Sequence, residues 1–158
     1  LGYIVAAQVY DKWRVREIRL IVQSTMHPVD IDERVEAFLA SYATQLQELS
    51  EEAFAAAIEG YRSSRLAPFL TYEDLAEDLF DEVANGTYSW NRKPEDAARA
   101  LQVTKKDLVD MYTDYIAPGG VHRRRVASAV VGADARKDKP TLPAPEGATL
   151  WTTPLKDV

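Results

Sequence analysis

The chain opens on two short runs rich in β-branched and aromatic side chains, which predict two adjacent strands. The first run covers residues 1–10, and the second covers Ile18 to Ser24 after a charged turn. In the second run the two alternating faces carry Ile18, Leu20, Val22 and Ser24 on one side and Arg19, Ile21 and Gln23 on the other. One face is therefore apolar and the other mixed, as in a sheet that is covered mainly on one side. We expect helices to provide that cover.

Helical periodicity dominates the chain from about residue 30 to residue 116. The expected helices begin at Asp30 or Asp32, at the N-caps Ser50, Thr71 and Thr104, and at Pro94, and they end near Leu49, Pro68, Asn85, Leu101 and Pro118. Most of these boundaries are residues that cap a helix or lie at a proline or glycine that stops one. The run from Arg125 to Val131 reads as a further strand.

The order of strand, strand, several helices and strand predicts the α+β class, with helices packed on one face of a mostly antiparallel sheet. Residues 1–133 are expected to form the domain portion, and residues 134–158 an extended Pro-rich tail. The chain starts at Leu1-Gly2-Tyr3 without an initiator methionine or a signal peptide. We therefore expect a soluble and trimmed chain.

Composition and net charge limit the classes of partner that the chain is expected to bind. The 158 residues suit one globular domain, and a net charge of -6 disfavours binding to nucleic acid or to anionic membranes. No apolar run approaches the roughly 20 residues that a membrane helix needs. The absence of cysteine excludes disulfides, thiolate nucleophiles and Cys-based zinc sites, and it fits a reducing compartment, either the cytoplasm or an organellar lumen.

The residues offer no complete active site. The two histidines, His27 and His122, lie in neither H-x-x-E-H nor H-E-x-x-H, so we expect no zinc site within the chain and predict that both are solvated. The acidic residues between 73 and 82 are expected to form a solvated helix face rather than a cation site. The basic run from His122 to Arg125 is expected to be a solvated turn rather than an anion site.

Several short motifs extend over the first four-fifths of the chain. They are Leu1-Gly2-Tyr3-Ile4-Val5, Ile21-Val22-Gln23-Ser24, Arg34-Val35-Glu36-Ala37-Phe38-Leu39, Glu51-Glu52-Ala53-Phe54, Tyr88-x-Trp90-x-Arg92, Thr104-Lys105-x-Asp107 and Arg123-Arg124-x-Val126. In this order they resemble the C-terminal half of insulin-degrading enzyme and its pitrilysin-type relatives. At one motif the family often has Tyr-x-Phe-x-Arg, where this chain has tryptophan.

That resemblance implies that the chain is part of a zinc metalloendopeptidase. In the family, four homologous α+β domains form two bowl-shaped halves around a chamber, and only the first domain carries H-x-x-E-H. The chain resembles the second half of the last domain, so it would be an incomplete, metallopeptidase-like domain with no catalytic or metal-binding residue. Zinc would lie in the catalytic half of the parent enzyme. The implied partners are peptide substrates and the N-terminal catalytic half.

The resemblance also assigns one substrate-binding residue, Tyr3. In the family, the tyrosine of Leu-Gly-Tyr and an arginine upstream of it reach across the chamber and hydrogen-bond a substrate carbonyl oxygen. From the residues alone, Tyr3 would instead be a strand tyrosine packed on the sheet. The family's lysine-rich turn that contributes to polyanion binding is replaced here by residues 66–70, which contain no lysine, so we do not expect that activity. Phe69 and Leu70 are expected to contact a neighbouring domain or helix instead.

Two further expectations concern assembly. The alternative reading of the same fold is a non-catalytic, processing-peptidase-like subunit that binds presequences or serves as a scaffold. If the sheet is divided at Leu1, unpaired strand edges would be exposed, and we expect the chain either to occur with the missing first half of the domain or to self-associate.

Overall fold

The computed structural model describes residues 2–12 and 15–130. Its elements follow in the order β1 (Ile4–Lys12), β2 (Val15–Gln23), α1 (Pro28–Glu48), α2 (Glu51–Leu66), α3 (Tyr72–Ala84), α4 (Arg92–Ala100) and α5 (Lys105–Tyr115). The α+β class is confirmed, since the described residues form five helices and an antiparallel sheet of two strands.

The two strands form a hairpin with opposite faces of different character. Their antiparallel register runs from Ile4 opposite Gln23 to Lys12 opposite Val15. Because successive side chains alternate between faces, the cross-strand pairs on one face are Val5 with Val22, Ala7 with Leu20 and Val9 with Ile18. The other face carries polar partners such as Gln8 opposite Arg19. The alternation predicted for the second strand is therefore confirmed.

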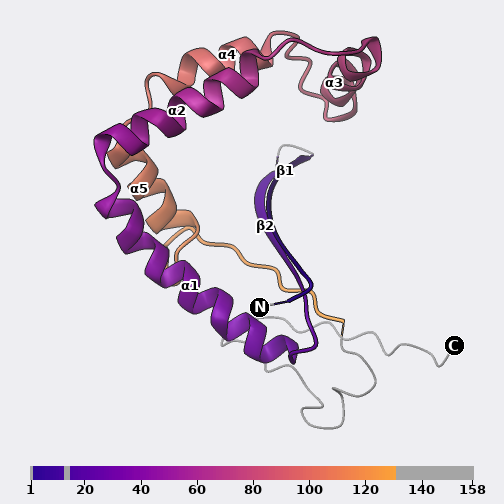
Figure 1. Ribbon diagram of the computed structural model, residues 1–158. Coiled ribbons are helices and arrows are strands. Elements are labelled where there is room, and N and C mark those ends of the chain that lie inside the picture. The colour runs from indigo at the N-terminus through magenta and orange to yellow at the C-terminus, as the bar shows by residue number, and fades with distance from the viewer. Residues whose placement is uncertain (1, 13–14, 131–158) are drawn as a thin grey trace, which may run out of the picture.

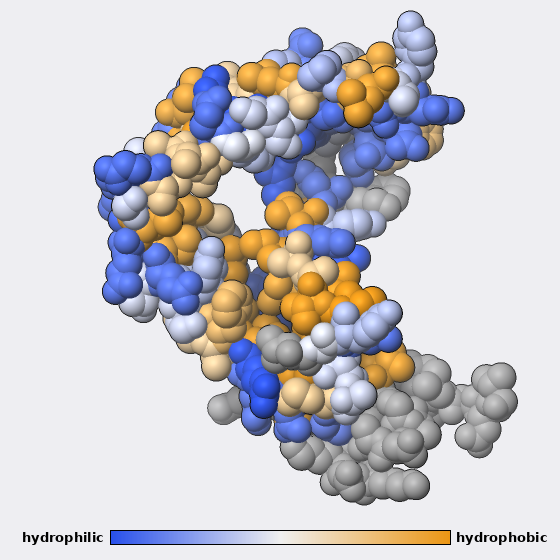
Figure 2. All heavy atoms as spheres, in the orientation of Figure 1, coloured by the Kyte–Doolittle hydropathy of each residue, from blue (hydrophilic) through white to orange (hydrophobic). Residues whose placement is uncertain are grey.

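The helices form a long arc that doubles back on itself (Figure 1). α1 and α2 follow one another outward, α3 lies at the far end, and α4 and α5 return beside them, so that α2 packs against α4 and α1 against α5. The hairpin stands in the opening of this arc. Apolar residues gather around it on the face of the molecule seen in Figure 2. The helices pack more extensively with one another than with the sheet.

A buried apolar cluster of the helical arc lies between α1 and α5. Leu46, Tyr112 and Ala117 form its centre. The partly buried residues around it are Leu39, Ala43, Leu108, Val109 and Ile116. The Tyr112 hydroxyl donates a hydrogen bond of 2.8 Å to the Leu39 carbonyl oxygen, which satisfies the polar end of a buried ring. This contact ties the last helix to the first.

Most predicted helix boundaries are confirmed by their caps. Ser50, Thr71 and Thr104 each accept a backbone N–H at the start of a helix, and the last two belong to capping boxes. Gly86 directly follows the C-cap Asn85 and has a φ of 64°, a left-handed conformation that stops α3. Gly119, with a φ of 84°, lies in the turn that follows α5.

The start of the first helix differs from the prediction. The N-cap is His27 rather than Asp30 or Asp32, and the His27 Nδ1 accepts the Val29 N–H at 3.3 Å. Pro28 explains the earlier start, because its fixed φ suits the first helical position and it has no N–H to satisfy. His27 is also buried, so the prediction that it is solvated is wrong.

The predicted last strand is absent from the described residues. Residues 125–130 form no strand, and Val126 is 96% exposed. The preceding basic residues instead pair with α1: Arg123 contacts Glu36, and Arg125 contacts Asp32 and Glu36. The β propensity of this run is thus outweighed by ion pairs that hold it near α1. Val131 and the tail predicted at residues 134–158 lie outside the described residues.

Candidate functional site

Tyr3 lies immediately before β1 and projects from the end of the hairpin. Its side chain is 89% exposed, so it is not packed on the sheet. The Tyr3 backbone N–H donates to the Gln23 carbonyl oxygen at 2.7 Å, which continues the hairpin pairing one residue beyond the strand. The backbone of Tyr3 is therefore fixed while its phenol is free to meet another molecule.

Gly2 explains how the strand ends come so close. A Cβ built at Gly2 would lie 2.2 Å from the Gln23 carbonyl oxygen, far inside van der Waals contact. Only glycine fits at this position without moving the backbone. The lack of space for a side chain at residue 2 thus explains why a glycine precedes the candidate tyrosine in Leu-Gly-Tyr.

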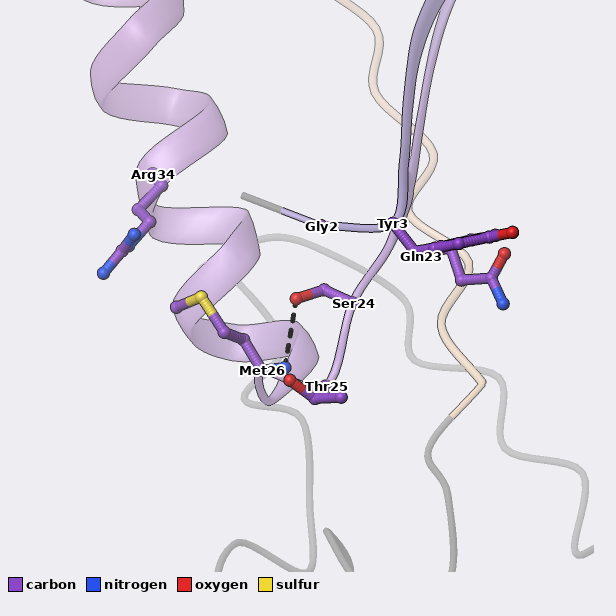
Figure 3. Close-up of a pocket in the computed structure, with 7 residues that line it drawn as sticks. All are labelled: Gly2, Tyr3, Gln23, Ser24, Thr25, Met26 and Arg34. Carbon is purple, nitrogen blue, oxygen red and sulfur yellow. Dashed lines mark hydrogen bonds between the residues drawn. The ribbon is translucent and has the colours of Figure 1, made fainter.

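A shallow hollow lies between the strand ends and the first turns of α1 (Figure 3). Its volume is about 490 Å³. The lining residues are Gly2, Tyr3, Gln23, Ser24, Thr25, Met26 and Arg34. In Figure 3 the side chains of Tyr3 and Gln23 point the same way, away from α1, whereas Ser24 and Met26 point toward it. The Met26 N–H donates to the Ser24 Oγ at 3.1 Å, so the corner that follows Gln23 is also fixed.

A second polar cluster lies at the turn between α3 and α4. Glu82 is 8% exposed, so the prediction of a solvated acidic face is wrong for this residue. Its carboxylate accepts hydrogen bonds from the Arg92 guanidinium, from the Thr87 hydroxyl at 2.6 Å and from the Ser89 N–H at 2.9 Å. The hydrogen bond from Arg92, reinforced by Thr87 and Ser89, outweighs desolvation and lowers the pKa of Glu82 from its ordinary 4.5 to about 2.

The position of Glu82 on its helix would have revealed this burial. Glu82 follows Leu75 by seven residues and Leu79 by three, so it lies on the apolar stripe of α3 rather than opposite it. The Tyr88-x-Trp90-x-Arg92 motif supplies its partner. Tyr88 has a φ of 52°, which is uncommon for a residue with a side chain. This cluster shapes the α3–α4 turn and lies away from Tyr3.

The basic run is not a free anion site. Arg123 makes a two-pronged ion pair with the Glu36 carboxylate, at 2.7 and 2.8 Å, and this bond lowers the pKa of Glu36. The prediction of a solvated turn is therefore wrong for Arg123, whose side chain is mostly buried. Arg124 and Arg125 are exposed as predicted, although Arg125 also pairs with Asp32. His122 is exposed, as predicted, and its ring centroid lies 5.1 Å from that of Tyr115.

Phe69 and Leu70, which were expected to contact a neighbouring domain or helix, lie in the link between α2 and α3. The Lys93 Nζ lies 3.9 Å from the centroid of the Phe69 ring, so Phe69 contacts a residue of α4. Leu70 is 90% exposed. Contact with another domain stays a prediction.

Two features are absent from residues 2–12 and 15–130, a cluster of metal ligands and a membrane-spanning helix. No three His, Cys, Asp or Glu residues gather there as a set that could hold a metal ion. None of the helices in residues 2–12 and 15–130 has the length and apolarity to cross a bilayer.

The steric argument at Gly2 gives a testable substitution. We expect Gly2→Ala to separate the strand ends, break the hydrogen bond between Tyr3 N–H and the Gln23 carbonyl, and destabilise the hairpin by about 1 to 3 kcal/mol. Gly60→Ala is the control, because a Cβ at Gly60 meets no atom within 4 Å and the change should stabilise α2 by about 1 kcal/mol. Urea unfolding measures both effects. Equal stability changes in the two variants would show that the close approach at Gly2 carries no strain.

Comparisons with known proteins place this geometry in context. The family model described as PQQ synthase PqqF-like, C-terminal lobe domain 4, matches residues 1–79. The chain is 27% identical over 150 residues to insulin-degrading enzyme-like 1, peroxisomal, of Arabidopsis thaliana, which covers 92% of the chain and 16% of that protein. It is 30% identical over 131 residues to the insulin-degrading enzyme of Drosophila melanogaster, covering 83% of the chain.

The human insulin-degrading enzyme is 26% identical over 134 residues, which cover 85% of the chain. The chain spans only 13% of the length of the Drosophila and human relatives. The likeness is therefore to a small portion of large peptidases.

Proposed function

Because the chain belongs to the PQQ synthase PqqF-like, C-terminal lobe domain 4 family, we propose that it is the non-catalytic C-terminal region of an insulin-degrading-enzyme-like zinc metalloendopeptidase. The family match over residues 1–79 and the similarity to insulin-degrading enzymes over 83% to 92% of the chain support this assignment. In this role the chain closes the peptide-binding chamber of the parent enzyme and contacts the substrate there.

The substrate contact is made by Tyr3. The observation that carries this proposal is an exposed phenol on a backbone fixed by Gly2 and Gln23, in a chain of this family. A phenol has one O–H donor on a rigid ring, so it can donate a hydrogen bond to a carbonyl oxygen at a set position. A donor aimed at the charge that develops on that oxygen stabilises the transition state more than the bound substrate.

Zinc belongs to the catalytic half of the parent in this proposal. There it would act as the Lewis acid of peptide hydrolysis. The residues described in this chain bring together no set of three side chains able to bind it. The contribution of the chain is therefore the Tyr3 hydroxyl and the shape of the chamber wall.

We expect the isolated chain to bind no stoichiometric zinc and to cleave no peptide, whereas the full-length protein does both. Metal analysis and a quenched-peptide assay, each run with and without a chelator, compare the two proteins. Stoichiometric zinc with chelator-sensitive turnover in the isolated chain would contradict the proposed division of labour. An inactive, zinc-free full-length protein would remove the peptidase assignment altogether.

We also propose that the isolated chain self-associates through the hairpin. Val5, Val9 and Ile18 on the apolar face are each about half exposed or more, and in the described residues neither outer edge of the hairpin pairs with another strand. Exposed edges and apolar faces favour strand addition or swapping. Size-exclusion chromatography with light scattering should therefore give a dimer or larger species at micromolar concentration. A soluble monomer with a sharp thermal transition would show that the hairpin needs no partner.

The compartment that we propose is reducing, either the cytoplasm or an organellar lumen. The cysteine-free sequence suits it, and one similar protein is named as peroxisomal. Peptides are the proposed substrates, and neither nucleic acid nor a membrane is a proposed partner.

A further inference from the structure

We propose that Gln23 is a second substrate-contacting residue, which binds the backbone N–H of an extended peptide beside the carbonyl bound by Tyr3. The inference rests on the proposed function, because it requires that a peptide lies at Tyr3. Its starting point is the placement of the two side chains. Tyr3 precedes Ile4, the residue that pairs with Gln23, and the Tyr3 and Gln23 side chains project to the same side in Figure 3, away from α1.

Three local features of the hairpin end hold Tyr3 and Gln23 in this placement. Gln23 is the last residue of β2 and lies opposite Ile4, and its carbonyl oxygen accepts the Tyr3 N–H at 2.7 Å. Gly2 permits that approach, since any larger residue would collide with the same carbonyl. Beyond Gln23, the hydrogen bond between Met26 N–H and Ser24 Oγ holds the corner. The two side chains are therefore presented together by a fixed backbone.

Both side chains have unused hydrogen-bonding capacity. Within residues 2–12 and 15–130, neither the Tyr3 hydroxyl nor the Gln23 amide makes a hydrogen bond to another side chain or to the backbone. Both side chains are exposed and point away from α1, although both residues belong to the lining of the hollow. Several charged residues of the hairpin are instead engaged in ion pairs, Arg16 with Asp11 and Arg19 with Glu17.

The chemistry of the pair matches a peptide backbone. A tyrosine hydroxyl donates to a carbonyl oxygen, and the oxygen of a glutamine amide accepts from an N–H. Neighbouring strands lie about 4.8 Å apart, and an extended peptide rises about 3.3 Å per residue, so the two side chains can reach peptide groups one or two residues apart. Both groups are neutral, and they contact the backbone of the substrate. Such a site favours extended peptides with little regard to their side chains.

The test uses the full-length peptidase with Gln23→Leu, which removes the amide at similar volume. We expect KM to rise about fivefold with kcat within twofold of wild type, because a neutral hydrogen bond to a bound peptide contributes equally to the ground and transition states. Gln8→Leu is the matched control: it is an exposed glutamine on the same hairpin, far from Tyr3, and its KM should stay at the wild-type value.

A substrate with a single backbone ester in place of the N–H nearest the cleaved bond separates contact from structure. The ester should raise KM relative to the amide substrate in the wild type and in Gln23→Glu, because both keep an acceptor oxygen at residue 23. In Gln23→Leu the acceptor is absent, so the ester and amide substrates should have the same KM. An unchanged KM in Gln23→Leu, or an ester effect of equal size in that variant, would overturn the role of Gln23. The proposed function is tested separately by Tyr3→Phe, whose loss of kcat would persist even if Gln23 proved silent.

Discussion

Tyr3→Phe in the full-length peptidase is expected to lower kcat by about 100-fold and to change KM little. The variant removes one hydroxyl and keeps the ring, so it deletes the proposed hydrogen bond to the substrate carbonyl oxygen. Loss of one donor to a developing oxyanion costs about 2.7 to 4 kcal/mol of transition-state stabilisation. Because that hydrogen bond strengthens in the transition state, its loss appears in kcat rather than in KM. Steady-state kinetics on a quenched peptide measures both constants.

Tyr72→Phe is the matched control for this experiment. Tyr72 is 92% exposed on α3, at the far end of the helical arc, so its hydroxyl has no expected role in turnover. Wild-type constants in Tyr3→Phe would show that the phenol does not contact the reacting carbonyl, and the proposed substrate role of Tyr3 would then be lost.

Glu82→Gln is expected to destabilise the chain by about 3 kcal/mol. The substitution removes the carboxylate that accepts the Arg92 hydrogen bonds, and breaking a buried ion pair costs about 3 to 5 kcal/mol. The Arg92 side chain is 29% exposed and keeps Asp11 as an acidic neighbour at 4.0 Å, so we expect a loss at the lower end of this range. Urea unfolding measures the loss, and hydrogen exchange should locate it in the α3–α4 turn. Asp81→Asn is the control, because this neighbouring carboxylate is exposed and its loss should change stability by less than about 0.5 kcal/mol.

The same pair predicts how stability depends on pH. The folded-state pKa of Glu82 is about 2, below its ordinary 4.5, so the folded state favours the charged form. The contribution of Glu82 is therefore fully present above about pH 4.5, and it is lost as the pH falls toward 2. The difference between the two pKa values corresponds to about 3 kcal/mol. In Glu82→Gln the stability should vary less over this range, and an unchanged pH profile would show that Glu82 is not the group that titrates.

Local signals in the sequence predict the elements of this fold well. Caps such as Ser50, Thr71 and Thr104 depend on hydrogen bonds within one helical turn, so their positions follow from neighbouring residues alone. The alternation in β2 likewise predicts which hairpin face is apolar. The predicted strand is wrong for residues 125–130, because β propensity depends on a partner strand, whereas Arg123 and Arg125 are held by acidic residues of α1.

The candidate site depends on contacts between residues that are distant in sequence. The family resemblance points to Tyr3. The steric need for glycine at residue 2 and the position of Gln23 beside Tyr3 appear only in the structure, where residues 2 and 23 meet across the hairpin. The burial of His27 also depends on the three-dimensional fold, because His27 lies at the corner between β2 and α1. For Glu82 the helical period alone predicts burial, because the residue lies on the apolar stripe of α3. Its charge favours the opposite prediction of an exposed side chain.

The paired arrangement of the helices also governs the entropy of folding. The α2–α4 pair lies inside the α1–α5 pair, with α3 at the closed end, so the two contacts are nested along the chain. The segment enclosed by α1 and α5 is roughly twice as long as that enclosed by α2 and α4, and closing it first would cost about 0.6 kcal/mol more in loop entropy. Once the inner pair has formed, the outer helices are already brought near one another. Formation of the α2–α4 contact therefore lowers the entropic cost of joining α1 to α5, and on this ground we expect the arc to close from its tip toward the hairpin.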